Sequence, residues 1–582
     1  MNPQCLPFPL NVYALTLELE YGQIEHLHFG AFEDQGDTAC DYPLAQQHAQ
    51  DELSSLLIPA PAEILEIGFG TGAFAKALAS QGYQLTALSC IKEEVEAAQA
   101  VENNGVEFVH SSLEQFNARQ RFDVVLIQQS AQYFDPLELL AFATGVLKEG
   151  GQLLIADEFT LDDSEIRPEP RPVLASFLQL AERCGFAVQR QRELARQVAP
   201  GLREFQQLLR KHQDSLLKTL SLAPAQFEAL SEKLDSLARK YTEVRLSYTL
   251  LDFKKESGAA RPALFGSIKA FAIDEIPPLF EKSFDASFDA EIWHWKYGNG
   301  RGRAVCVRDD EKLLAHYGGA PRDILYFSEK TKALQICDVM VLPGYRSFVS
   351  RDTLFFKTAA TLLEQQVGNC AEHLLGFGFP NQRVLRVAQR LGLYDVTDRF
   401  IEIDYPQACN LEGESSLTVG AFDHEQANAQ SQVDALWSSM ATSFTDDIIG
   451  VRDWHYLQYR YFRHPLWARG AYECLELRAS DDAKLKALVF LKPHEGGRLL
   501  MDIIGDVQLF PELLTALVIY LGERSETLRS RVTQAHAPSL SLAGSKQYEL
   551  GIEIPCNIWT RGPAADTLKD AWWLTAGDMD FL

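Results

Sequence analysis

The chain has 582 residues, too many for one hydrophobic core, and this length suggests roughly three or four domains. Its 80 acidic and 54 basic residues give a net charge of −26, which argues against a general nucleic-acid or membrane-surface binder, because both need basic patches. The ten cysteines are scattered without a Cys-x-x-Cys pair, which indicates reduced thiols and no zinc or other metal site. The first residues lack the pattern of a signal peptide, and no apolar run is long enough to span a bilayer. We therefore expect a cytoplasmic protein.

The glycine-rich stretch after residue 67 carries the clearest local signal. Periodic apolar residues predict a helix over 44–57, and the apolar run Glu63–Ile67 predicts a strand. Glycines follow at 68, 70 and 72, and residues 73–78 are typical of a helix. A strand, a glycine turn and a helix open a doubly wound sheet, in which the turn lets the backbone approach a nucleotide-like ligand. A ligand site is expected at this turn.

The spacing of the glycines separates two classes of ligand. A dinucleotide loop has the pattern Gly-x-Gly-x-x-Gly, whereas this stretch is Glu-x-Gly-x-Gly-x-Gly, with Glu66 near the strand end. An acid at that place repels phosphate and suits an amino-bearing or cationic ligand. The pattern resembles the first motif of the class I S-adenosylmethionine-dependent methyltransferases. The resemblance implies a Rossmann-like domain that binds S-adenosylmethionine through Glu66, Gly68, Phe69, Gly70 and Gly72.

Three later segments extend the resemblance. Strands are expected over 83–89, 106–110 and 122–127, and a Gly-Gly turn leads into a buried strand that ends near residue 158. The family ends its second strand with an acid that holds the ribose, and Ser89 stands there in this chain. By the same resemblance, Glu114 lies in the region that faces the adenine, and Gln128 begins the loop on the substrate side.

Methyl transfer needs proximity and, where the acceptor must lose a proton, a base. Glu158 and its neighbour Asp157 are expected at the carboxyl end of a strand, where substrates bind in such sheets. Tyr133, His28 and His110 are the other candidates, and the sequence does not choose among them. In the resembled family the segment before the first strand caps the cofactor, which would place His28, Tyr42 and Gln46 at the site. A covering helix with a surface histidine is the alternative.

Residues 196–241 interrupt the alternation of strands and helices. Phe227, Leu230 and Leu234 fall on one helical face there, and two helices are predicted. A strand over 244–253 follows, so we expect this domain to cover residues 1–256, with 196–241 as an inserted helical lid over the active site. A plain packing hairpin is the alternative.

Residues 266–405 have a different pattern after a linker at 257–262. A strand over 334–341 runs into a turn and a helix through 355–363, and Phe379-Pro380-Asn381 precedes a further helix. The series resembles GNAT-type acyltransferases, in which a strand splays from its neighbour to pair with pantetheine, and the next turn holds the pyrophosphate of coenzyme A. The resemblance implies that acetyl-CoA or another acyl-CoA is bound by Val341, Arg346, Ser347 and Asn381.

The pyrophosphate turn departs from the family pattern. It is usually Arg-Gly-x-Gly-x-Gly/Ala, but the stretch from Arg346 to Arg351 contains no glycine, so side chains there obstruct a close approach of phosphate. The candidate catalytic groups are Tyr394 as general acid and Asp338 or His316 as base. For each of them an ordinary role in the core or at a strand end is the alternative.

Residues 433–582 repeat the second pattern in weaker form, after a polar linker over 409–432. Gln458-Tyr459-Arg460-Tyr461 echoes His294-Trp295-Lys296-Tyr297, and each motif is followed by two strands. The counterpart of the cofactor strand, 499–506, has no basic, glycine-rich turn after it, so this copy is interpreted as a degenerate acyltransferase fold. The aromatic tail at 572–578 is expected to dock onto the protein, with Asp578 in a packing role rather than at a substrate.

The fold prediction is therefore α/β: a Rossmann-like methyltransferase domain with a helical lid, followed by two GNAT-like mixed α/β domains, the second degenerate. The function expected is methyl transfer from S-adenosylmethionine and acyl transfer from acetyl-CoA to a small polar metabolite such as an amino-sugar or nucleotide-sugar. The first alternative is a methyltransferase whose tandem GNAT-like half only binds substrate or a carrier protein. A polyketide-loading module and a non-enzymatic scaffold rank lower. We expect no nucleic-acid or membrane partner, and a homo-oligomer is left open.

Overall fold

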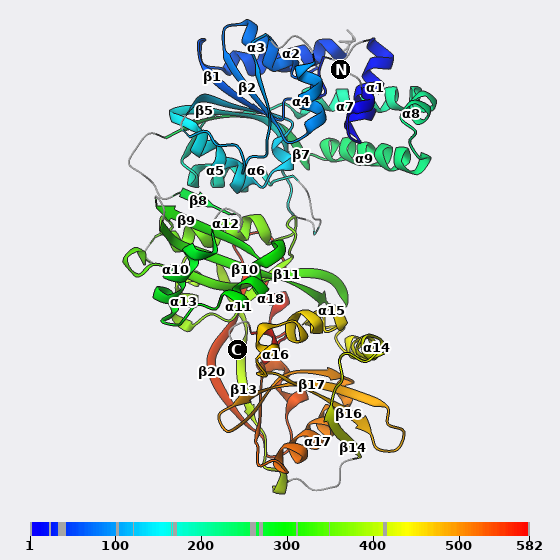
Figure 1. The fold of residues 1–582 in the computed structure, drawn as a ribbon, viewed down its shortest axis with the longest axis vertical. Helices are drawn as coiled ribbons and strands as arrows, with labels where there is room; N and C mark the ends of the chain where they lie inside the picture. Colours follow the sequence, from blue (N-terminus) through cyan, green and yellow to red (C-terminus); the bar gives the residue numbers. More distant parts are fainter. Residues whose placement is uncertain are drawn as a thin grey trace. The chain divides into compact units, whose positions relative to one another are not determined.

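The structure is a computed structural model that describes residues 3–22, 25–32, 42–100, 104–119, 121–164, 166, 171–256, 263–266, 272–309, 312–347, 350–410 and 416–579. The chain divides into two compact units, shown in Figure 1. The first comprises residues 1–165 and 169–265, and the second comprises 166–168 and 266–582. The expected linker at 257–262 lies outside the described residues.

The first unit is built on one sheet with the strand order β3-β2-β1-β4-β5-β7-β6. Its strands are β1 (Glu63–Ile67), β2 (Gln84–Ser89), β3 (Glu107–His110), β4 (Phe122–Gln128), β5 (Leu147–Thr160), β6 (Phe186–Glu193) and β7 (Leu246–Lys255). The strands from β3 to β5 are parallel, and β7 runs antiparallel between β5 and β6. Central β1 is buried along nearly its whole length, including Glu66. The predicted Rossmann-like α/β sheet is confirmed.

Helices cover both faces of this sheet (Figure 1). They are α1 (Leu10–Tyr21), α2 (Tyr42–Leu56), α3 (Ala73–Ser80), α4 (Lys92–Gln99), α5 (Pro136–Val146) and α6 (Leu174–Arg183), followed by α7 (Ala195–Lys211), α8 (Gln213–Thr219) and α9 (Pro224–Thr242). The prediction of two helices in 196–241 is wrong, because three form there. A short turn at His212 separates α7 from α8, and the apolar periodicity does not show that break.

The three helices α7–α9 pack against α1. The rings of Tyr13 on α1 and Phe205 on α7 meet edge to face with centroids 5.1 Å apart. Lys211 donates a hydrogen bond to Glu20 at the other end of the same contact, with an Nζ–Oε2 distance of 2.7 Å. Phe205, Leu230 and Leu234 belong to the same buried cluster as the face of the sheet. The helices are thus part of the core of the unit.

The first sheet of the second unit runs β12-β11-β10-β15-β21, and β9 pairs with the other end of β10. Its strands are β9 (Arg303–Asp309), β10 (Lys312–Tyr326), β11 (Glu329–Val341), β12 (Leu375–Gly378), β15 (Ile448–Gly450) and β21 (Trp572–Trp573). Its helices are α10 (Ile276–Phe284), α11 (Ala290–Tyr297), α12 (Leu354–Gln366) and α13 (Gln382–Arg390).

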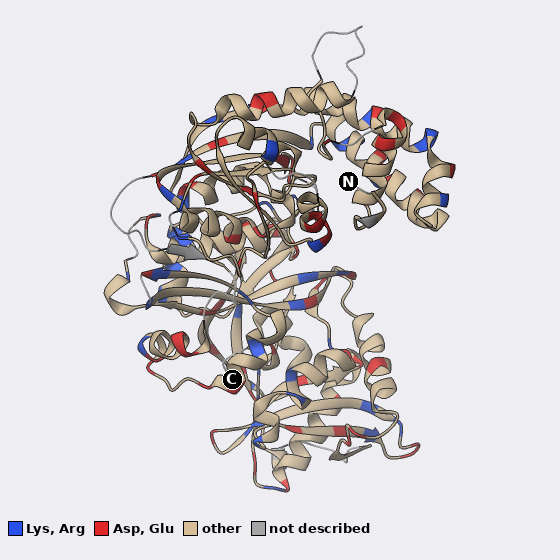
Figure 2. Cartoon of the chain, turned by 45° about the horizontal axis from the view of Figure 1, so that its top comes forward, with Lys and Arg blue, Asp and Glu red and all other residues tan. Residues whose placement is uncertain are grey.

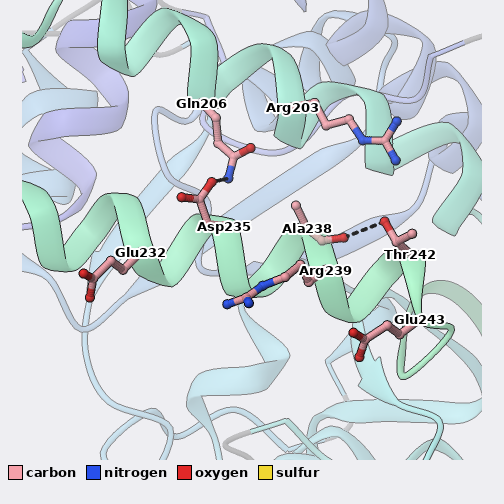
Figure 3. Close-up of a pocket in the computed structure, with 8 residues that line it drawn as sticks. All are labelled: Arg203, Gln206, Glu232, Asp235, Ala238, Arg239, Thr242 and Glu243. Carbon is pink, nitrogen blue, oxygen red and sulfur yellow. Dashed lines mark hydrogen bonds between the residues drawn. The ribbon is translucent and has the colours of Figure 1, made fainter.

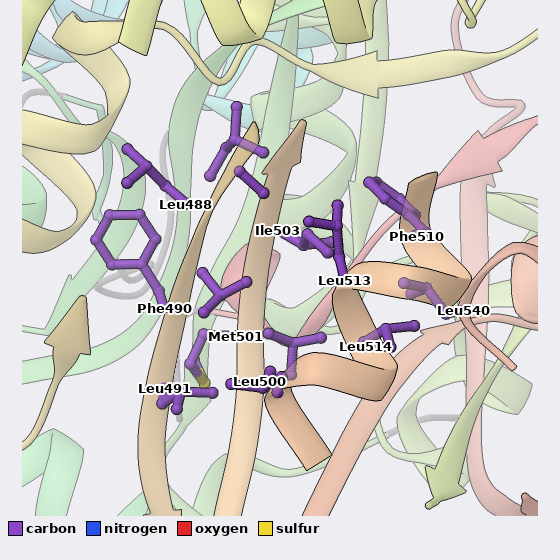
Figure 4. Packing of buried hydrophobic residues seen from close by; sticks show 14 of the residues in the cluster. Leu488, Phe490, Leu491, Leu500, Met501, Ile503, Phe510, Leu513, Leu514 and Leu540 are labelled. Carbon is purple, nitrogen blue, oxygen red and sulfur yellow. The ribbon is translucent and has the colours of Figure 1, made fainter. Parts of the chain in front are cut away.

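The second sheet of this unit runs β14-β16-β17-β18-β19-β13-β20. Its strands are β13 (Tyr394–Asp404), β14 (Leu417–Ala421), β16 (Glu473–Ala479), β17 (Leu485–His494), β18 (Gly497–Gly505), β19 (Leu528–Thr533) and β20 (Lys546–Asn557). The core against it contains residues of β17, β18 and α17 (Phe510–Gly522), among them Leu488, Phe490, Met501, Ile503 and Leu513 (Figure 4). The helices around it include α14 (Ala429–Ala441), α15 (Trp454–Leu457), α16 (Pro465–Ala468) and α18 (Ala565–Leu568).

Strands are exchanged between these two sheets. β13 comes from the stretch assigned to the first acyltransferase-like half, 266–405, yet it pairs with β19 and β20 of the second sheet. Conversely, β15 and β21 come from the second half and extend the first sheet. β10 is longer than β9, so Ile324–Tyr326 would form an open edge, and β15 covers it. A boundary at residue 405 therefore separates strands that belong to one sheet.

A strand also lies within the polar stretch 409–432, for which a linker was predicted. β14 pairs antiparallel with β16 at the edge of the second sheet, with Leu417 opposite Ala479. The five residues of β14 alternate only weakly between half-buried and exposed positions, so the hydrophobic pattern is faint. That part of the linker prediction is wrong.

Charged residues are interspersed in each unit. Figure 2 shows Lys and Arg positions scattered among acidic and uncharged ones in both. Within the described parts of the chain, every helix is too short or too polar to cross a bilayer. The same residues contain no cluster of three or more His, Cys, Asp or Glu side chains arranged to hold a metal ion.

Candidate functional site

The glycine turn after β1 leaves space at one position only. All three glycines have positive φ, with values of 72°, 56° and 74° at Gly68, Gly70 and Gly72. A Cβ at Gly68 would lie 2.5 Å from Ser130, and one at Gly72 would lie 2.8 Å from the Phe108 ring. A Cβ at Gly70 would meet its nearest atom only at 4.0 Å. Packing therefore requires glycine at 68 and 72, whereas Gly70 faces the space into which a ligand fits.

Glu66 presents a buried carboxyl beside this turn. Its side chain is 3% exposed, and Oε2 has no hydrogen-bond partner within the described part of the protein. Burial raises the pKa of Glu66 to about 8. A buried oxygen without a donor is unusual in a folded protein and suits a ligand that brings one, such as an amino group. Phe69, also predicted at the cofactor, is buried with its ring 5.0 Å from that of Phe108.

Ser89 ends β2 at the predicted ribose position, but its hydroxyl is already engaged. It donates to Glu94 Oε2 at 2.7 Å and accepts from the Ile91 amide at 3.0 Å. A hydroxyl has one proton, so Ser89 has none left for a ligand. Glu94 lies in the first turn of α4 and is 4% exposed, and burial raises its pKa although the Ser89 bond lowers it. Glu94 thus places a carboxyl group beside Ser89, and it was not among the site residues predicted from the sequence.

The loop that carries His28 lies against the glycine turn. Thr71 donates to the Glu25 carbonyl, and the Phe29 amide donates to Gln129 Oε1 at 3.2 Å, just beyond β4. His28 Nδ1 is 3.0 Å from the Phe29 carbonyl, which only accepts, so Nδ1 carries the proton. Nε2 is buried without a partner within the described residues, and burial lowers the pKa of His28 to about 4. At neutral pH His28 therefore offers a lone pair.

The other candidate residues of the N-terminal domain differ in burial and in hydrogen bonding. Gln128 ends β4, and its Nε2 is buried with no partner in the described part of the chain. Gln46 donates to the carbonyls of His26 and His28 and so holds the loop, while Tyr42 is buried in the core. Glu114 is exposed after β3, and His110 is exposed with Nε2 3.3 Å from the Cys90 carbonyl.

Glu158 and Asp157 both have full sets of partners. Glu158 is 2% exposed and accepts from Arg171 Nε at 2.6 Å and from the Tyr241 hydroxyl on α9 at 2.9 Å. Asp157 accepts from the amides of Ala131 and Glu158, which fixes the loop after β4. These bonds hold Arg171, Tyr241 and the loop after β4 in place, so the geometry favours positioning roles for both carboxyls, while burial raises the pKa of Asp157 to about 7. Tyr133 is 76% exposed on that loop.

In the second unit, β11 and β12 pair in parallel from Ala333–Leu375 to Ile336–Gly378. β12 ends at Gly378, so β11 has no partner in β12 beyond Ile336. A bulge opposite His316 gives Asp338 a φ of 48°. Such a gap between parallel strands exposes backbone groups that an extended ligand could pair with.

Asp338 lies in this gap region as half of a buried ion pair. Its Oδ2 accepts from Lys296 Nζ at 2.9 Å and from the Tyr297 hydroxyl at 2.7 Å. Burial raises the pKa of Asp338, but the Lys296 ammonium outweighs this and holds the pKa below its usual value. A carboxylate stabilised in this way is a weak base. His316 is fully buried, with Nδ1 2.8 Å from the Asp338 carbonyl, and burial lowers its pKa.

Tyr394 and the predicted coenzyme A residues do not converge on one free surface. The Tyr394 hydroxyl is 2.8 Å from that of Tyr317, and burial raises the pKa of Tyr394 well above its usual value. Arg346 folds back, and its Nε donates to the carbonyl of buried Val341 at 2.8 Å. Ser347 is exposed, and residues 348 and 349 of the turn lie outside the described residues.

Asn381 is engaged as a helix cap. It caps α13 by accepting from the Val384 amide at 3.0 Å. Thr353 caps α12 in the same way by accepting from the Phe356 amide. Both helices that follow the diverging strands therefore already have one of their N-terminal amides satisfied by the chain itself.

The two acyltransferase-like copies contain the same tyrosine–aspartate pair. Tyr461 donates to Asp502 on β18 at 2.6 Å, as Tyr297 does to Asp338 on β11. Between the copies the rings of Trp295 and Tyr459, which hold equivalent places in the repeated motif, stack with centroids 4.6 Å apart. Asp578 is buried between Arg322 and Arg452, at 2.7 and 2.6 Å, in the packing role expected for it.

An open groove lies away from all of these residues. It runs between α7 and α9, and Figure 3 shows its polar lining, in which Gln206 donates to Asp235 at 2.7 Å. The lining residues are Arg203, Gln206, Glu232, Asp235, Ala238, Arg239, Thr242 and Glu243. None of them was a site candidate, and none carries a buried polar group without a partner, so the glycine turn is the better candidate for a ligand site.

Two protein-family models match the chain. Residues 65–155 match the methyltransferase domain model, and residues 266–394 match the acetyltransferase (GNAT) domain model. The first segment spans the glycine turn and strands β2–β4, and the second spans the diverging strands β11 and β12.

The chain is also similar to parts of several characterised proteins. It is 27% identical over 126 residues to a ubiquinone biosynthesis O-methyltransferase of Rickettsia canadensis. These 126 residues cover 21% of this chain and 53% of that protein. It is 28% identical over 115 residues to nodulation protein S of Rhizobium tropici, which covers 19% and 48%. The chain thus spans about half the length of these relatives.

Solved structures give a further likeness. A putative sarcosine dimethylglycine methyltransferase from Galdieria sulphuraria is 18% identical, with a TM-score of 0.37, over 42% of this chain and 98% of that one. The cyclopropane synthase MmaA2 from Mycobacterium tuberculosis is 18% identical, with a TM-score of 0.35, over 39% and 89%. From the two family matches, the chain carries a methyltransferase domain in its N-terminal part and a GNAT-type acetyltransferase domain in its C-terminal part.

Proposed function

We propose that the chain is an enzyme with two transferase activities. Its N-terminal domain methylates a small polar metabolite, such as an amino-sugar or nucleotide-sugar, with S-adenosylmethionine as donor. Its C-terminal half transfers an acyl group from acetyl-CoA to a substrate of the same pathway, at an amine. The observation that carries the first activity is Glu66, a buried carboxyl with an unpartnered oxygen beside the open position at Gly70.

The residues around the glycine turn fit S-adenosylmethionine. Glu66 would accept from its amino group, the backbone at Gly70 would approach it closely, and Glu94 would accept from the ribose hydroxyls. Glu94 Oε2 already accepts from Ser89, but a carboxylate has several acceptor positions. When bound, the cofactor supplies an electrophilic methyl group on a sulfonium. The loop of residues 25–29 lies against the turn and would keep water from this region.

We propose His28 as the group that takes a proton from the acceptor, although burial makes it a weak base. Its Nε2 lone pair is free at neutral pH, because the pKa lies near 4 and Nδ1 holds the proton. The O-methyltransferase names of the ubiquinone relatives support a hydroxyl as the acceptor. A hydroxyl group of a sugar would fit both the proposed polar metabolite and methyl transfer to oxygen.

The second candidate function keeps the methyltransferase but gives the GNAT-like half only a binding role, for substrate or a carrier protein. A specific observation favours it: Arg346, the one cation predicted at the pyrophosphate, donates to the Val341 carbonyl. The turn also lacks glycine from 346 to 351, so a phosphate would meet side chains.

Calorimetric titration with S-adenosylmethionine and with acetyl-CoA, in separate runs, tests both activities. Under the two-activity proposal each ligand binds, Gly70→Trp abolishes only the first binding, and Arg346→Glu abolishes only the second. Gly185→Trp is the matched control, because Gly185 also has positive φ and open space but lies away from the turn. Binding of S-adenosylmethionine alone would leave the C-terminal half as a binding module. Binding of neither would contradict the proposal.

Substitutions of Ser89 and of Glu94 are expected to have different effects on recognition of the ribose. Glu94→Gln should weaken S-adenosylmethionine binding by about tenfold or more, because it removes a charge-assisted hydrogen bond. Ser89→Ala should change the affinity by less than about threefold, because its proton is already committed to Glu94. Titration of the two variants beside the exposed control Glu96→Gln checks this. A larger loss of affinity in Ser89→Ala than in Glu94→Gln would indicate that Ser89, and not Glu94, contacts the ribose.

A further inference from the structure

The second acyltransferase-like copy has its own pair of diverging strands. β18 and β19 pair in parallel over three residue pairs, from Arg498–Leu528 to Leu500–Ser530, and then separate. In the first copy, the pairing of β11 with β12 likewise stops, at Ile336–Gly378, where β12 itself ends. By the GNAT resemblance, the gap that opens beyond such a pair holds the pantetheine arm of the acyl donor. The second copy therefore has a gap of the right kind.

The C-terminal segment Trp572–Met579 lies in this second gap. On the β19 side, Thr575 forms an antiparallel bridge with Val532, and the Thr533 amide donates to the Leu574 carbonyl at 3.2 Å. On the β18 side, the Thr575 hydroxyl donates to Asp502 Oδ1 at 2.8 Å. The segment thus spans the two strands just beyond their last shared pair.

The fit of this segment leaves no room for another ligand beside it. A Cβ at Gly577 would lie 2.3 Å from Asp502 Oδ2 and 2.5 Å from the Tyr461 hydroxyl. Every residue from 572 to 579 is buried. The close approach of the backbone at Gly577 explains why a residue without a side chain stands there.

Charged side chains hold the main chain of the segment as they would hold a ligand. Arg460 donates to the carbonyl of Gly577 at 2.7 Å and to that of Met579 at 3.2 Å. Gln335 donates to the carbonyl of Asp578 at 2.6 Å. In the first copy, Lys296 holds the place of Arg460 and pairs instead with Asp338. Within the described residues, no third segment forms a bridge between the separated ends of β11 and β12.

We propose that the segment Trp572–Met579 is a built-in occupant of the second gap, so that the tandem offers one acyl-donor site, in the first copy alone. The segment bonds to β19 through its main chain at Leu574 and Thr575 and then forms a 3-10 turn over Ala576–Asp578, so its amides and carbonyls occupy the place where a pantetheine arm would bond. The proposal rests on the proposed function in one respect, namely that the first gap takes an acyl-CoA.

Hydrogen exchange of the full-length protein, followed by mass spectrometry, tests the occupancy directly. Peptides covering 572–579 should exchange as slowly as peptides of β18, whereas exchange within seconds, as at a free chain end, would overturn the proposal. Gly577→Ala should speed exchange of this segment about tenfold or more, because the added methyl group clashes with Asp502. Gly420→Ala, where a Cβ would meet nothing within 4 Å and φ is not positive, is the matched control and should leave the segment protected.

Acetyl-CoA titration gives the second readout. One equivalent should bind to the wild-type chain and none to Arg346→Glu. A second equivalent, or an equivalent that survives Arg346→Glu, would overturn the proposal. If the wild-type chain binds no acetyl-CoA, the acyl-transfer part of the proposed function fails, and the exchange rate of 572–579 alone then decides whether the gap is occupied.

Discussion

Binding of S-adenosylmethionine at pH 6.5 should release close to one proton, and Glu66→Gln should abolish both the release and most of the binding. The pKa of Glu66 is raised to about 8 in the unliganded protein, so this carboxyl is protonated at pH 6.5. A ligand ammonium beside it favours the ionised form, and the proton must leave. Titrations in buffers of different ionisation enthalpy measure this release. Glu107→Gln, on β3, which β2 separates from β1 in the sheet, is the control and should keep it.

The same carboxyl makes the unliganded protein less stable as pH rises. A folded-state pKa raised from 4.5 to about 8 means that the unfolded chain loses this proton first, so the free energy of unfolding falls between these values. Each pKa unit corresponds to about 1.4 kcal/mol, which allows an upper limit of about 5 kcal/mol. Glu66→Gln should therefore gain stability over wild type at pH 8 but not at pH 4.5. Denaturant titrations at both pH values check this, and an equal difference at the two would contradict it.

Glu66 thus has opposite effects on two quantities: it strengthens binding of the ligand, but it lowers the free energy of unfolding of the unliganded protein. Such opposite effects are typical of a binding residue. A side chain retained for packing stabilises the fold, whereas Glu66 costs stability until a ligand supplies the donor it lacks. Proton release with no loss of binding in Glu66→Gln would place the proton on another group. Of the other groups near the turn, His28 is already neutral at pH 6.5 and cannot supply it.

The methyl-transfer site was predictable where its residues are adjacent in sequence. Glu66 and the glycines lie on one strand and turn, and their order alone indicates an amino-bearing ligand. Glu94 was not predictable in this way, because its approach to Ser89 depends on how α4 packs after β2. The pairing of Glu158 with Tyr241 joins residues 83 apart and depends on the packing of α9.

The exchanged strands and the C-terminal segment show a second limit. Hydrophobic alternation sets which face of β13 is buried, but it does not state which sheet takes the strand. The repeat of Tyr297 and Tyr461 was visible in the sequence, and each tyrosine donates to an aspartate on the third strand after it. The position of residues 572–579 between β18 and β19 joins segments about 40 to 75 residues apart, and no local pattern encodes it.

The variant Asp578→Asn should lower the free energy of unfolding of the second unit by about 3–5 kcal/mol, the largest loss expected from a single polar change in this chain. Asp578 is 1% exposed and accepts from Arg322 at 2.7 Å and from Arg452 at 2.6 Å. An amide in its place has no negative charge, so the two buried guanidinium groups lose the charge that balances theirs. Denaturant unfolding followed by tryptophan fluorescence measures the loss, since Trp572 and Trp573 are buried next to the segment.

The controls separate the ion pairs from a general effect of the substitution. Asp566→Asn changes an exposed aspartate of the same stretch and should cost less than about 0.5 kcal/mol. Arg322→Gln combined with Asp578→Asn should cost less than the sum of the two single changes, because the pair they share is lost only once. Additive costs would mean that the arginine and the aspartate act independently, in contradiction to the geometry.

The pH dependence of stability tests the ion pairs of Asp578 independently. Burial raises the pKa of Asp578, but Arg452 and Arg322 together hold it below its usual value. The stability it contributes is therefore present above the ordinary aspartate pKa near 4 and is lost as the pH falls through the lower, folded-state value. Asp578→Asn should remove that acid-side decline while lowering stability at neutral pH. Because Arg322 lies on β10 and Arg452 follows β15, both in the first sheet, the same variant should loosen the C-terminal segment from that sheet.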